Sequence, residues 1–216
     1  HRREGFVPAA GARLVALTTQ SGRLTAPISL EGGAPIQALV DLGNDLPLIL
    51  SPGPDSRKLL RDRPTSTALL GGYGSAAVGQ VATARDVAFA GAHIAAVPVT
   101  VAPRSIGFAA NLGLPVLRRF RLQLDFAGGR MWLTPQAGAP AFYKDLTGLN
   151  GYVDGEVLRI LHVARGGPAE KAGFTAGDLV AAIDGQPARL ANANLAEAAK
   201  GRVLDFTLTS GAHRRL

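Results

Sequence analysis

The sequence predicts a mainly β protein, with an all-β domain in the first two thirds of the chain and a small α+β domain after it. In the first part, short apolar or alternating runs recur about every 8–12 residues between glycine-containing turns, which is typical of a sandwich or barrel. A linker-like Gln-Ala-Gly-Ala-Pro follows at residues 136–140, and beyond it strand-like and helix-like runs alternate. We therefore expect domains at residues 1–140 and 145–216 of the 216-residue chain.

The first domain is expected to consist of strands with two short helices. A helix at residues 56–63 should end before Pro64, and a helical turn is expected within residues 114–120. Glycine-containing turns such as Gly128-Gly129 separate the strands. The expected strands are residues 13–19, 23–30, 36–42, 46–51, 78–90, 93–102, 121–126 and 130–135.

In the second domain, strands are expected at residues 157–164, 179–183 and 203–209. Residues 168–173 begin with Pro and end with Gly, the usual order at the two ends of a helix. A second helix is expected at residues 192–200, stopped by Gly201.

Composition excludes several classes of protein. With 47% hydrophobic and only 18% charged residues, the chain is not a disordered tail. The absence of cysteine excludes a disulfide scaffold, thiol catalysis and cysteine-based zinc sites. No apolar run approaches the roughly 20 residues that span a bilayer, so we expect no membrane span. Met131 is the sole methionine, so we expect that the chain comes from a longer precursor.

The net charge of +7 does not indicate a nucleic-acid partner. Of the 23 basic residues, 19 are Arg, and they are scattered rather than clustered with aromatic residues that stack on bases. The four histidines lack metal-ligand spacing, and His162 is expected to be a half-buried structural residue. No phosphate-binding or dinucleotide-binding motif is present, so we expect neither a metal nor a cofactor.

Asp41 stands out because it ends the apolar run 38–40 and precedes another apolar run at 46–50. A carboxylate between two core strands is costly to bury unless it is paired or hydrogen-bonded. Gly43 permits a tight turn that aims the side chain outward. Two interpretations stay open from these residues: a loop aspartate bonded to its own turn, or a carboxylate presented for chemistry.

The order of elements over residues 13–135 resembles the retropepsin-like aspartyl proteases, in particular bacterial members with a C-terminal PDZ domain. The resemblance includes the Leu-Gly pair at 112–113 and the run Leu-Arg-Arg-Phe-Arg-Leu-Gln-Leu-Asp-Phe at 117–126. It implies an acid-protease β-barrel lobe in which Asp41 is the catalytic aspartate. The remainder of the active-site loop would then be Leu42, Gly43 and Asn44.

The same resemblance assigns a flap, the hairpin that closes over substrate, to the glycine-rich stretch 70–79. Its central residues are Gly71, Gly72, Tyr73 and Gly74.

The active-site loop departs from the family pattern. Leu42 stands where the family has Thr or Ser, whose hydroxyl ties two active-site loops together, and leucine cannot make that bond. Asn44 replaces a small residue, and Pro115 falls where the second motif often has Asp or Asn. These departures weaken the expectation of an efficient active site.

Hydrolysis of this type needs two carboxylates that share one proton. The sequence offers one Asp-x-Gly loop and therefore half of such a site. We expect the second aspartate to come from a homodimer or from a lobe in a missing N-terminal part of the precursor.

The C-terminal part resembles a bacterial PDZ domain over about residues 145–216. Gly-Pro-Ala at 167–169, Ala-Gly at 172–173, Gly-Asp at 177–178 and Ile-Asp-Gly at 183–185 occur in the order typical of that family. PDZ domains bind a peptide as an added strand, with its terminal carboxylate held by backbone N–H groups. The loop for that carboxylate is expected just before the first strand, at Gly148, Leu149, Asn150 and Gly151.

The resemblance implies an aspartic endopeptidase lobe that contributes one catalytic Asp, with PDZ-mediated recognition of a polypeptide. It also implies a periplasmic or secreted location. The alternative is a degenerate lobe that acts with its PDZ domain as a peptide-binding or assembly module. A PDZ domain that merely packs on the lobe also stays open.

Overall fold

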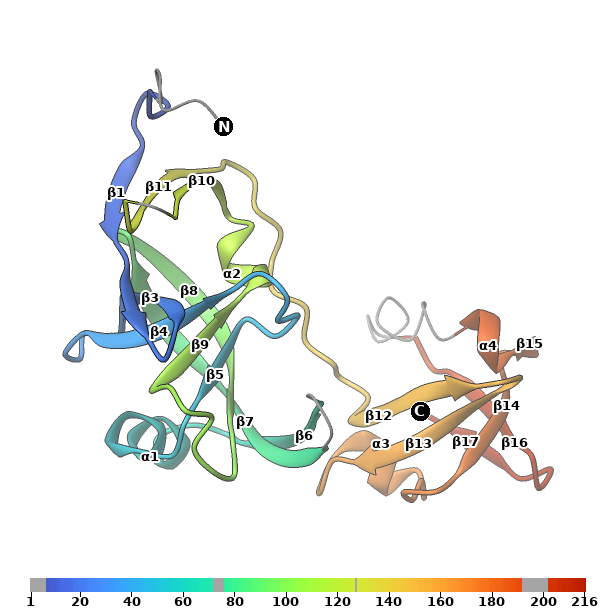
Figure 1. Cartoon of the computed structure of the whole chain (residues 1–216). Helices are drawn as coiled ribbons and strands as arrows, with labels where there is room; N and C mark the ends of the chain where they lie inside the picture. The colour runs from blue at the N-terminus through green and yellow to red at the C-terminus, as the bar shows by residue number, and fades with distance from the viewer. Residues whose placement is uncertain (1–6, 72–75, 127, 192–201) are drawn as a thin grey trace. The chain divides into compact units, whose positions relative to one another are not determined.

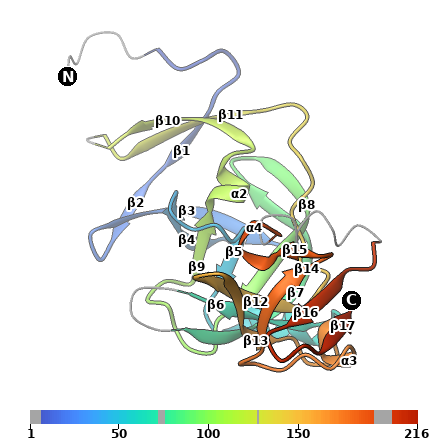
Figure 2. The same ribbon diagram turned by 90° about the vertical axis from the view of Figure 1, so that its right-hand side faces the viewer.

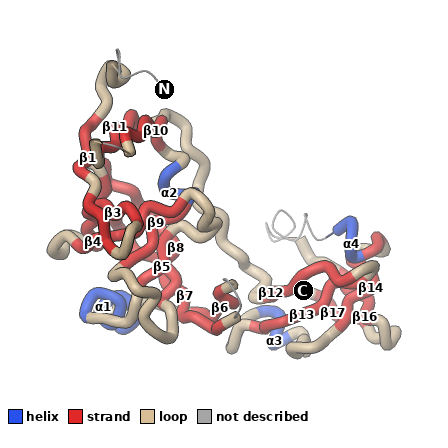
Figure 3. The backbone as a smooth tube through the Cα atoms, in the orientation of Figure 1, coloured by secondary structure: helices blue, strands red, loops and turns tan. Residues whose placement is uncertain are grey.

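The computed structural model describes residues 7–71, 76–126, 128–191 and 202–216 (Figure 1). By compactness the chain divides into two units, residues 1–64 with 82–142 and residues 65–81 with 143–216. Strands are the main regular secondary structure of both units, and the helices are short (Figure 3). The prediction of a mainly β fold is confirmed. The domain limits at 140 and 145 stay a prediction, since the hairpin at 65–81 groups with the C-terminal unit.

One long sheet organises the first unit, in the order β2-β3-β4-β9-β5-β8-β7-β6, with β6 and the start of β7 grouped in the second unit. The strands are β2 (Thr18–Gln20), β3 (Arg23–Leu30), β4 (Ile36–Asp41), β5 (Leu48–Leu50), β6 (Ser66–Leu70), β7 (Ala77–Phe89), β8 (Ala92–Val101) and β9 (Ala110–Gly113). Helix α1 (Pro54–Arg61) follows β5.

Strand β9 was not predicted, yet it lies between β4 and β5 in this sheet (Figure 1). It runs parallel to β4, with Asp41 opposite Gly113, and antiparallel to β5, with Leu48 opposite Leu112. Leu112 and Gly113 are therefore the last two residues of a strand. This register brings the end of β4 next to the end of β9.

A smaller sheet in the first unit has the order β1-β11-β10, visible at the end of the unit that carries the N-terminal strand (Figure 2). It comprises β1 (Arg13–Ala16), β10 (Phe120–Asp125) and β11 (Arg130–Pro135), and helix α2 (Leu114–Leu117) precedes β10. In the turn after β10, Asp125 accepts a hydrogen bond from Gly128 N at 2.8 Å and pairs with Arg130 at 2.7 Å.

Alternate residues of the strands build the core of the first unit. Phe89 and Phe120 pack edge to face with ring centroids 5.6 Å apart, and Leu112, Leu117 and Met131 are fully buried. Burial of each such side chain contributes about 1.5–3 kcal/mol. Strands that are distant in sequence are held together by this core.

The second unit contains a sheet of order β12-β13-β14-β16-β17, with β15 paired to β14. The elements are β12 (Leu149–Asp154), β13 (Val157–Val163), α3 (Pro168–Lys171), β14 (Leu179–Ile183), β15 (Gln186–Pro187), α4 (Ala188–Ala191), β16 (Asp205–Leu208) and β17 (His213–Arg215). Phe174 and Phe206 pack edge to face at 5.1 Å in its core. The helix predicted at 192–200 lies outside the described residues.

The first strand of this sheet, β12, was not predicted, and the strand expected at residues 157–164 is β13. Leu149, Asn150 and Gly151 belong to β12 rather than to a loop, so the loop prediction was wrong for these three residues. A bulge between Asn150 and Gly151 shifts the register with β13. A Cβ on Gly151 would lie 2.4 Å from Arg159 O, so the bulge needs glycine there.

Strands β6 and β7 form an antiparallel hairpin, with Ser66 opposite Val81 and Leu70 opposite Ala77. Within the second unit, Leu69 N donates to Asn150 Oδ1 at 3.0 Å. Thr67 Oγ1 lies 3.0 Å from His162 Nε2. His162 is half-buried, as predicted.

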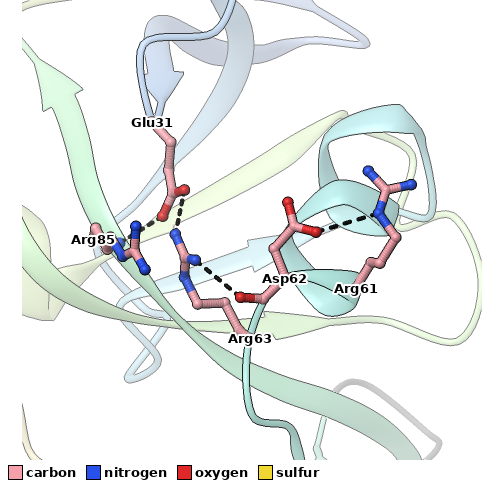
Figure 4. Close-up of polar contacts among 5 residues, drawn as sticks. All are labelled: Glu31, Arg61, Asp62, Arg63 and Arg85. Atoms are coloured by element: carbon pink, nitrogen blue, oxygen red, sulfur yellow. Dashed lines mark hydrogen bonds and ion pairs between the residues drawn. The ribbon is translucent and has the colours of Figure 1, made fainter.

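An ion pair ties the residues after α1 to the sheet of the first unit (Figure 4). Arg63 Nη2 donates to Glu31 Oε2, and its guanidinium side chain is only 11% exposed. Arg85 N donates to Glu31 Oε1 at 2.7 Å. Burial opposes ionisation of Glu31, but the hydrogen bonds from Arg85 and Arg63 and their positive charges outweigh it and hold its pKa below the ordinary 4.5.

Replacing Glu31 with glutamine should lower the free energy of unfolding by about 1–3 kcal/mol at neutral pH, because it leaves a nearly buried guanidinium without its anion. A carboxyl whose pKa is lowered in the folded state stabilises the fold fully at pH values above its ordinary pKa of 4.5. This contribution is lost as the pH falls below 4.5 and through the lowered pKa of the folded state. The deficit of the variant should therefore shrink in acid. Urea unfolding at several pH values measures this.

The control is Asp62→Asn. Asp62 pairs with Arg61 at the surface, where the side chains are 47% and 74% exposed. Such a pair contributes about 0–1 kcal/mol. A deficit of Glu31→Gln that is equal at all pH values, or no larger than that of the control, would contradict the role given to this pair.

Candidate functional site

Asp41 is the last residue of β4, and its half-buried carboxylate is held on both oxygens. Oδ1 accepts a hydrogen bond from Gly43 N at 3.0 Å. Oδ2 accepts one from Asn111 Nδ2 at 2.9 Å. The first donor belongs to the loop that follows β4 and the second to β9. The carboxylate is thereby fixed by two separate elements.

A chain of amide hydrogen bonds supports this arrangement. Asn111 Oδ1 accepts from Asn44 Nδ2 at 2.9 Å, and Asn44 Oδ1 accepts from Leu46 N at 3.0 Å. Every bond in the chain donates toward Asp41, which fixes the orientation of both amides. Leu114 N also donates to Asn44 O at 2.8 Å. The active-site loop predicted from the sequence is thus tied to β9 through side chains.

The two interpretations of Asp41 both have a counterpart in this geometry. The bond from Gly43 N is the bond to its own turn that a loop aspartate makes. The bond from Asn111 reaches across to a neighbouring strand 70 positions later in the chain, which a turn alone does not require. Asn111 was missed by the sequence analysis. Its signal was a single amide within the otherwise apolar run before Gly113.

Leu42 is exposed, with 48% of its surface accessible, and Leu114 at the start of α2 is 41% exposed. Both follow directly on the paired strand ends of β4 and β9. The loop position that carries a hydroxyl in the family is therefore occupied here by an exposed apolar side chain, that of Leu42. Asn44 supplies the polar contacts within the loop instead.

Gly113 is where the loop and β9 approach most closely. A Cβ at this position would lie 1.9 Å from Leu46 O and 2.8 Å from Asn44 O. Gly113 N donates to Pro47 O at 3.1 Å. Only glycine allows the backbone after Asn44 to pass this close to the strand.

Of the predicted flap residues, Gly71 is exposed at the end of β6. The remaining three, Gly72, Tyr73 and Gly74, lie outside the described residues. The flap role stays a prediction.

Of the predicted peptide-binding residues, Gly148 precedes β12 and the other three lie on it. Asn150 directs its side-chain oxygen to Leu69 N. β12 is the first strand of its sheet, and no described strand pairs with its other edge. Gly148 has φ +77°, a conformation that favours glycine. The described elements thus offer an unpaired strand edge with a glycine turn at its start.

Within the described ranges, no three His, Asp or Glu side chains gather in a way that could hold a metal ion. No helix in those ranges is both long and apolar enough to cross a membrane.

Near the start of the second unit, burial and then the negative charge of Asp145 raise the pKa of Tyr143.

Comparison with known proteins gives one family match, in the C-terminal part of the chain, and similar solved structures. The family model of the PDZ domain matches residues 159–202. A retropepsin-like aspartic protease from Rickettsia conorii is similar in structure, with 20% identity and a TM-score of 0.44, over 57% of this chain and 89% of that one. An HtrA-type protease solved with a decapeptide is similar with 15% identity and a TM-score of 0.33, over 96% of this chain and 77% of that one. No curated protein matches the sequence.

The PDZ part of the resemblance predicted from the sequence is thus found by a family model. The PDZ domain is recognised by its family model, and a retropepsin-like protease is among the similar structures.

Replacing Asp41 and Asn111 with alanine, singly and together, should give a coupling free energy of about 0.5–3 kcal/mol, because each side chain satisfies the other. The control cycle combines Asn111→Ala with Asp45→Ala, since Asp45 is exposed in the same loop. That pair should be additive within about 0.5 kcal/mol. Urea unfolding measures both cycles. If the Asp41 cycle is additive too, the hydrogen bond contributes nothing to the fold.

Replacing Gly113 with alanine should lower the free energy of unfolding by about 3 kcal/mol or more, because the added Cβ collides with backbone oxygens that cannot rotate away. The matched change is Gly71→Ala, where a Cβ meets no atom within 4 Å. That control should shift stability by only about 0.5 kcal/mol. Equal thermal stability of the two variants would show that the crowding at Gly113 is relieved easily.

Proposed function

We propose that this chain acts on polypeptides, with its PDZ domain docking a peptide and Asp41 contributing one carboxylate to a two-aspartate peptidase site. The observation that carries the hydrolytic part is the half-buried Asp41 carboxylate, held by N–H donors from the loop and from β9. A reacting group has to be fixed in this way, because small displacements cost large factors in rate.

In the proposed reaction, one carboxylate takes a proton from water while the other, protonated, polarises the scissile carbonyl. Asp41 supplies one of the two. The second aspartate comes from a second copy of the chain in a homodimer, or from another lobe of a longer precursor. The exposed Leu42 and Leu114 beside Asp41 suit an apolar contact with that partner lobe.

For the PDZ domain we propose peptide docking on the edge of β12 with which no described strand pairs. An extended segment gains main-chain hydrogen bonds there by adding one strand to the sheet. This is supported by the position of β12 at the end of its sheet and by the family match at residues 159–202. A periplasmic or secreted location belongs to the same proposal and rests only on the resemblance to bacterial aspartyl protease–PDZ proteins.

The second candidate function is a degenerate lobe that works with the PDZ domain as a peptide-binding or assembly module. Leu42 favours it, because an exposed aliphatic side chain cannot supply the hydroxyl hydrogen bond that links active-site loops in the family. Peptide docking is common to both candidates, and hydrolysis separates them.

Replacing Asp41 with asparagine should lower the rate of peptide cleavage at mildly acidic pH by at least about 100-fold, since the loss of a general acid or base has effects of this size. Cleavage of a fluorogenic peptide library by the purified chain, with and without pepstatin, measures this. The control Asp45→Asn removes the same charge from the same loop and should leave the rate unchanged.

The sedimentation behaviour of the active preparation should be that of a dimer or of a two-lobed precursor. An active monomer of this chain would contradict the half-site, and full activity of Asp41→Asn would reject Asp41 as catalytic. If neither the chain nor its precursor cleaves any peptide, the degenerate candidate is favoured. Leu42→Thr should raise the rate if the loop is only weakened.

A further inference from the structure

Three consecutive backbone N–H groups stand at the start of β12, and all three are satisfied inside the chain. Thr147 N donates to Asp145 Oδ1 at 2.8 Å. Gly148 N donates to Asp145 Oδ2 at 3.2 Å. Leu149 N donates to Thr147 Oγ1 at 3.1 Å. One aspartate and one hydroxyl therefore occupy these three main-chain donors.

The hydroxyl of Thr147 completes the arrangement. It donates to Asp145 Oδ1 at 2.6 Å, and the residue is only 6% exposed. Because its own hydrogen goes to Asp145, its oxygen is free to accept from Leu149 N. The Leu149 donor is thus linked to the same carboxylate through one intervening hydroxyl.

The turn is held in this shape from outside. Ala164 N donates to Gly148 O at 2.8 Å, and Ala169 N donates to Thr147 O at 3.1 Å. Gly148 has φ +77°, and a Cβ there would lie 3.1 Å from Ala164 Cβ. The backbone donors are therefore fixed in place, with Asp145 bound to them, next to the edge of β12 with which no described strand pairs.

Consecutive N–H groups that converge in a turn form a nest that binds anions. Such a nest is one of the recurring ways in which a protein captures the carboxylate at the end of a peptide. Here the nest already holds a carboxylate, that of Asp145. A peptide end that approached the same donors would have to displace Asp145 and would be repelled by its charge.

We propose that Asp145 determines the specificity of this edge: it fills the nest at the start of β12, so that the edge accepts extended segments without a free terminal carboxylate. The ligand class is therefore an internal stretch of polypeptide, or a peptide whose end is uncharged. The inference rests on the proposed docking of peptides at β12. It adds which peptides dock there, and it assigns Asp145 a role that the sequence analysis missed.

The experiment compares two pools of fluorescent decapeptides of randomised sequence, identical except that one ends in a carboxylate and the other in an amide. Binding to the immobilised full chain is measured as a function of peptide concentration. For the wild-type chain, the carboxylate pool should bind no more tightly than the amide pool. For Asp145→Ala, binding of the carboxylate pool should strengthen about tenfold or more, while the amide pool changes less than about threefold.

The matched control is Glu156→Gln, which removes one negative charge from the same unit without touching the turn. Glu156 is 78% exposed and pairs with Arg189 at the surface. This variant should leave the ratio between the two pools unchanged. Asp145→Asn serves as the second variant should Asp145→Ala unfold, because its amide oxygen still accepts from Thr147 N while its NH2 group cannot accept from Gly148 N. It should shift the ratio in the same direction by a smaller factor.

Three results would overturn the inference: a tenfold preference of the wild-type chain for the carboxylate pool, an equal gain for both pools in the folded Asp145 variants, or no change in either pool. NMR spectra of the backbone amides verify that each variant is folded. If neither pool binds the wild-type chain or any folded variant, the docking proposal itself is wrong, and the specificity inference fails with it. That result is distinct from the other three, which all require measurable binding of at least one pool.

Discussion

The insertion of β9 between β4 and β5 is the constraint on which the rest of the first unit depends. It joins two strands that are close in sequence through a third that comes about 60 residues later. The closeness of the backbones at Gly113 and the amide chain from Leu46 to Asp41 both follow from this register. Without β9, Asp41 would be an ordinary turn aspartate.

Elements whose signals are local in the sequence could be predicted. Strands β3, β11 and β14 begin and end at the predicted residues, because alternation and flanking turns mark them. Strand β9 was missed because four residues with one amide carry no period. Strand β12 was missed because Asn150 and Gly151 interrupt its apolar pattern, and the bulge that accommodates them depends on β13.

The same distinction applies to the sites. Asp41 was found because a charge between two apolar runs is visible in the sequence, whereas its partner Asn111 is defined only by strand pairing. Asp145 and Thr147 lie two residues apart, and a side chain that bonds the backbone two positions on is a known turn signal. The sequence signal predicts a turn but no binding role. The binding role follows from the position of this turn at the start of an edge strand. The two units thus share a feature: in each, N–H donors fix a carboxylate next to a strand terminus, after β4 in the first unit and before β12 in the second.

The crowding at Gly113 constrains this position through the fold, whereas the proposed chemistry constrains position 41. If every position were randomised and the variants selected only for soluble abundance, position 113 would retain glycine. Position 41 would accept several polar residues under that selection, since its hydrogen bonds contribute about 1 kcal/mol each. Selection for turnover would add position 41 to the restricted set and leave position 113 unchanged. Comparing the two selections would therefore map the chemistry of this lobe separately from its scaffold.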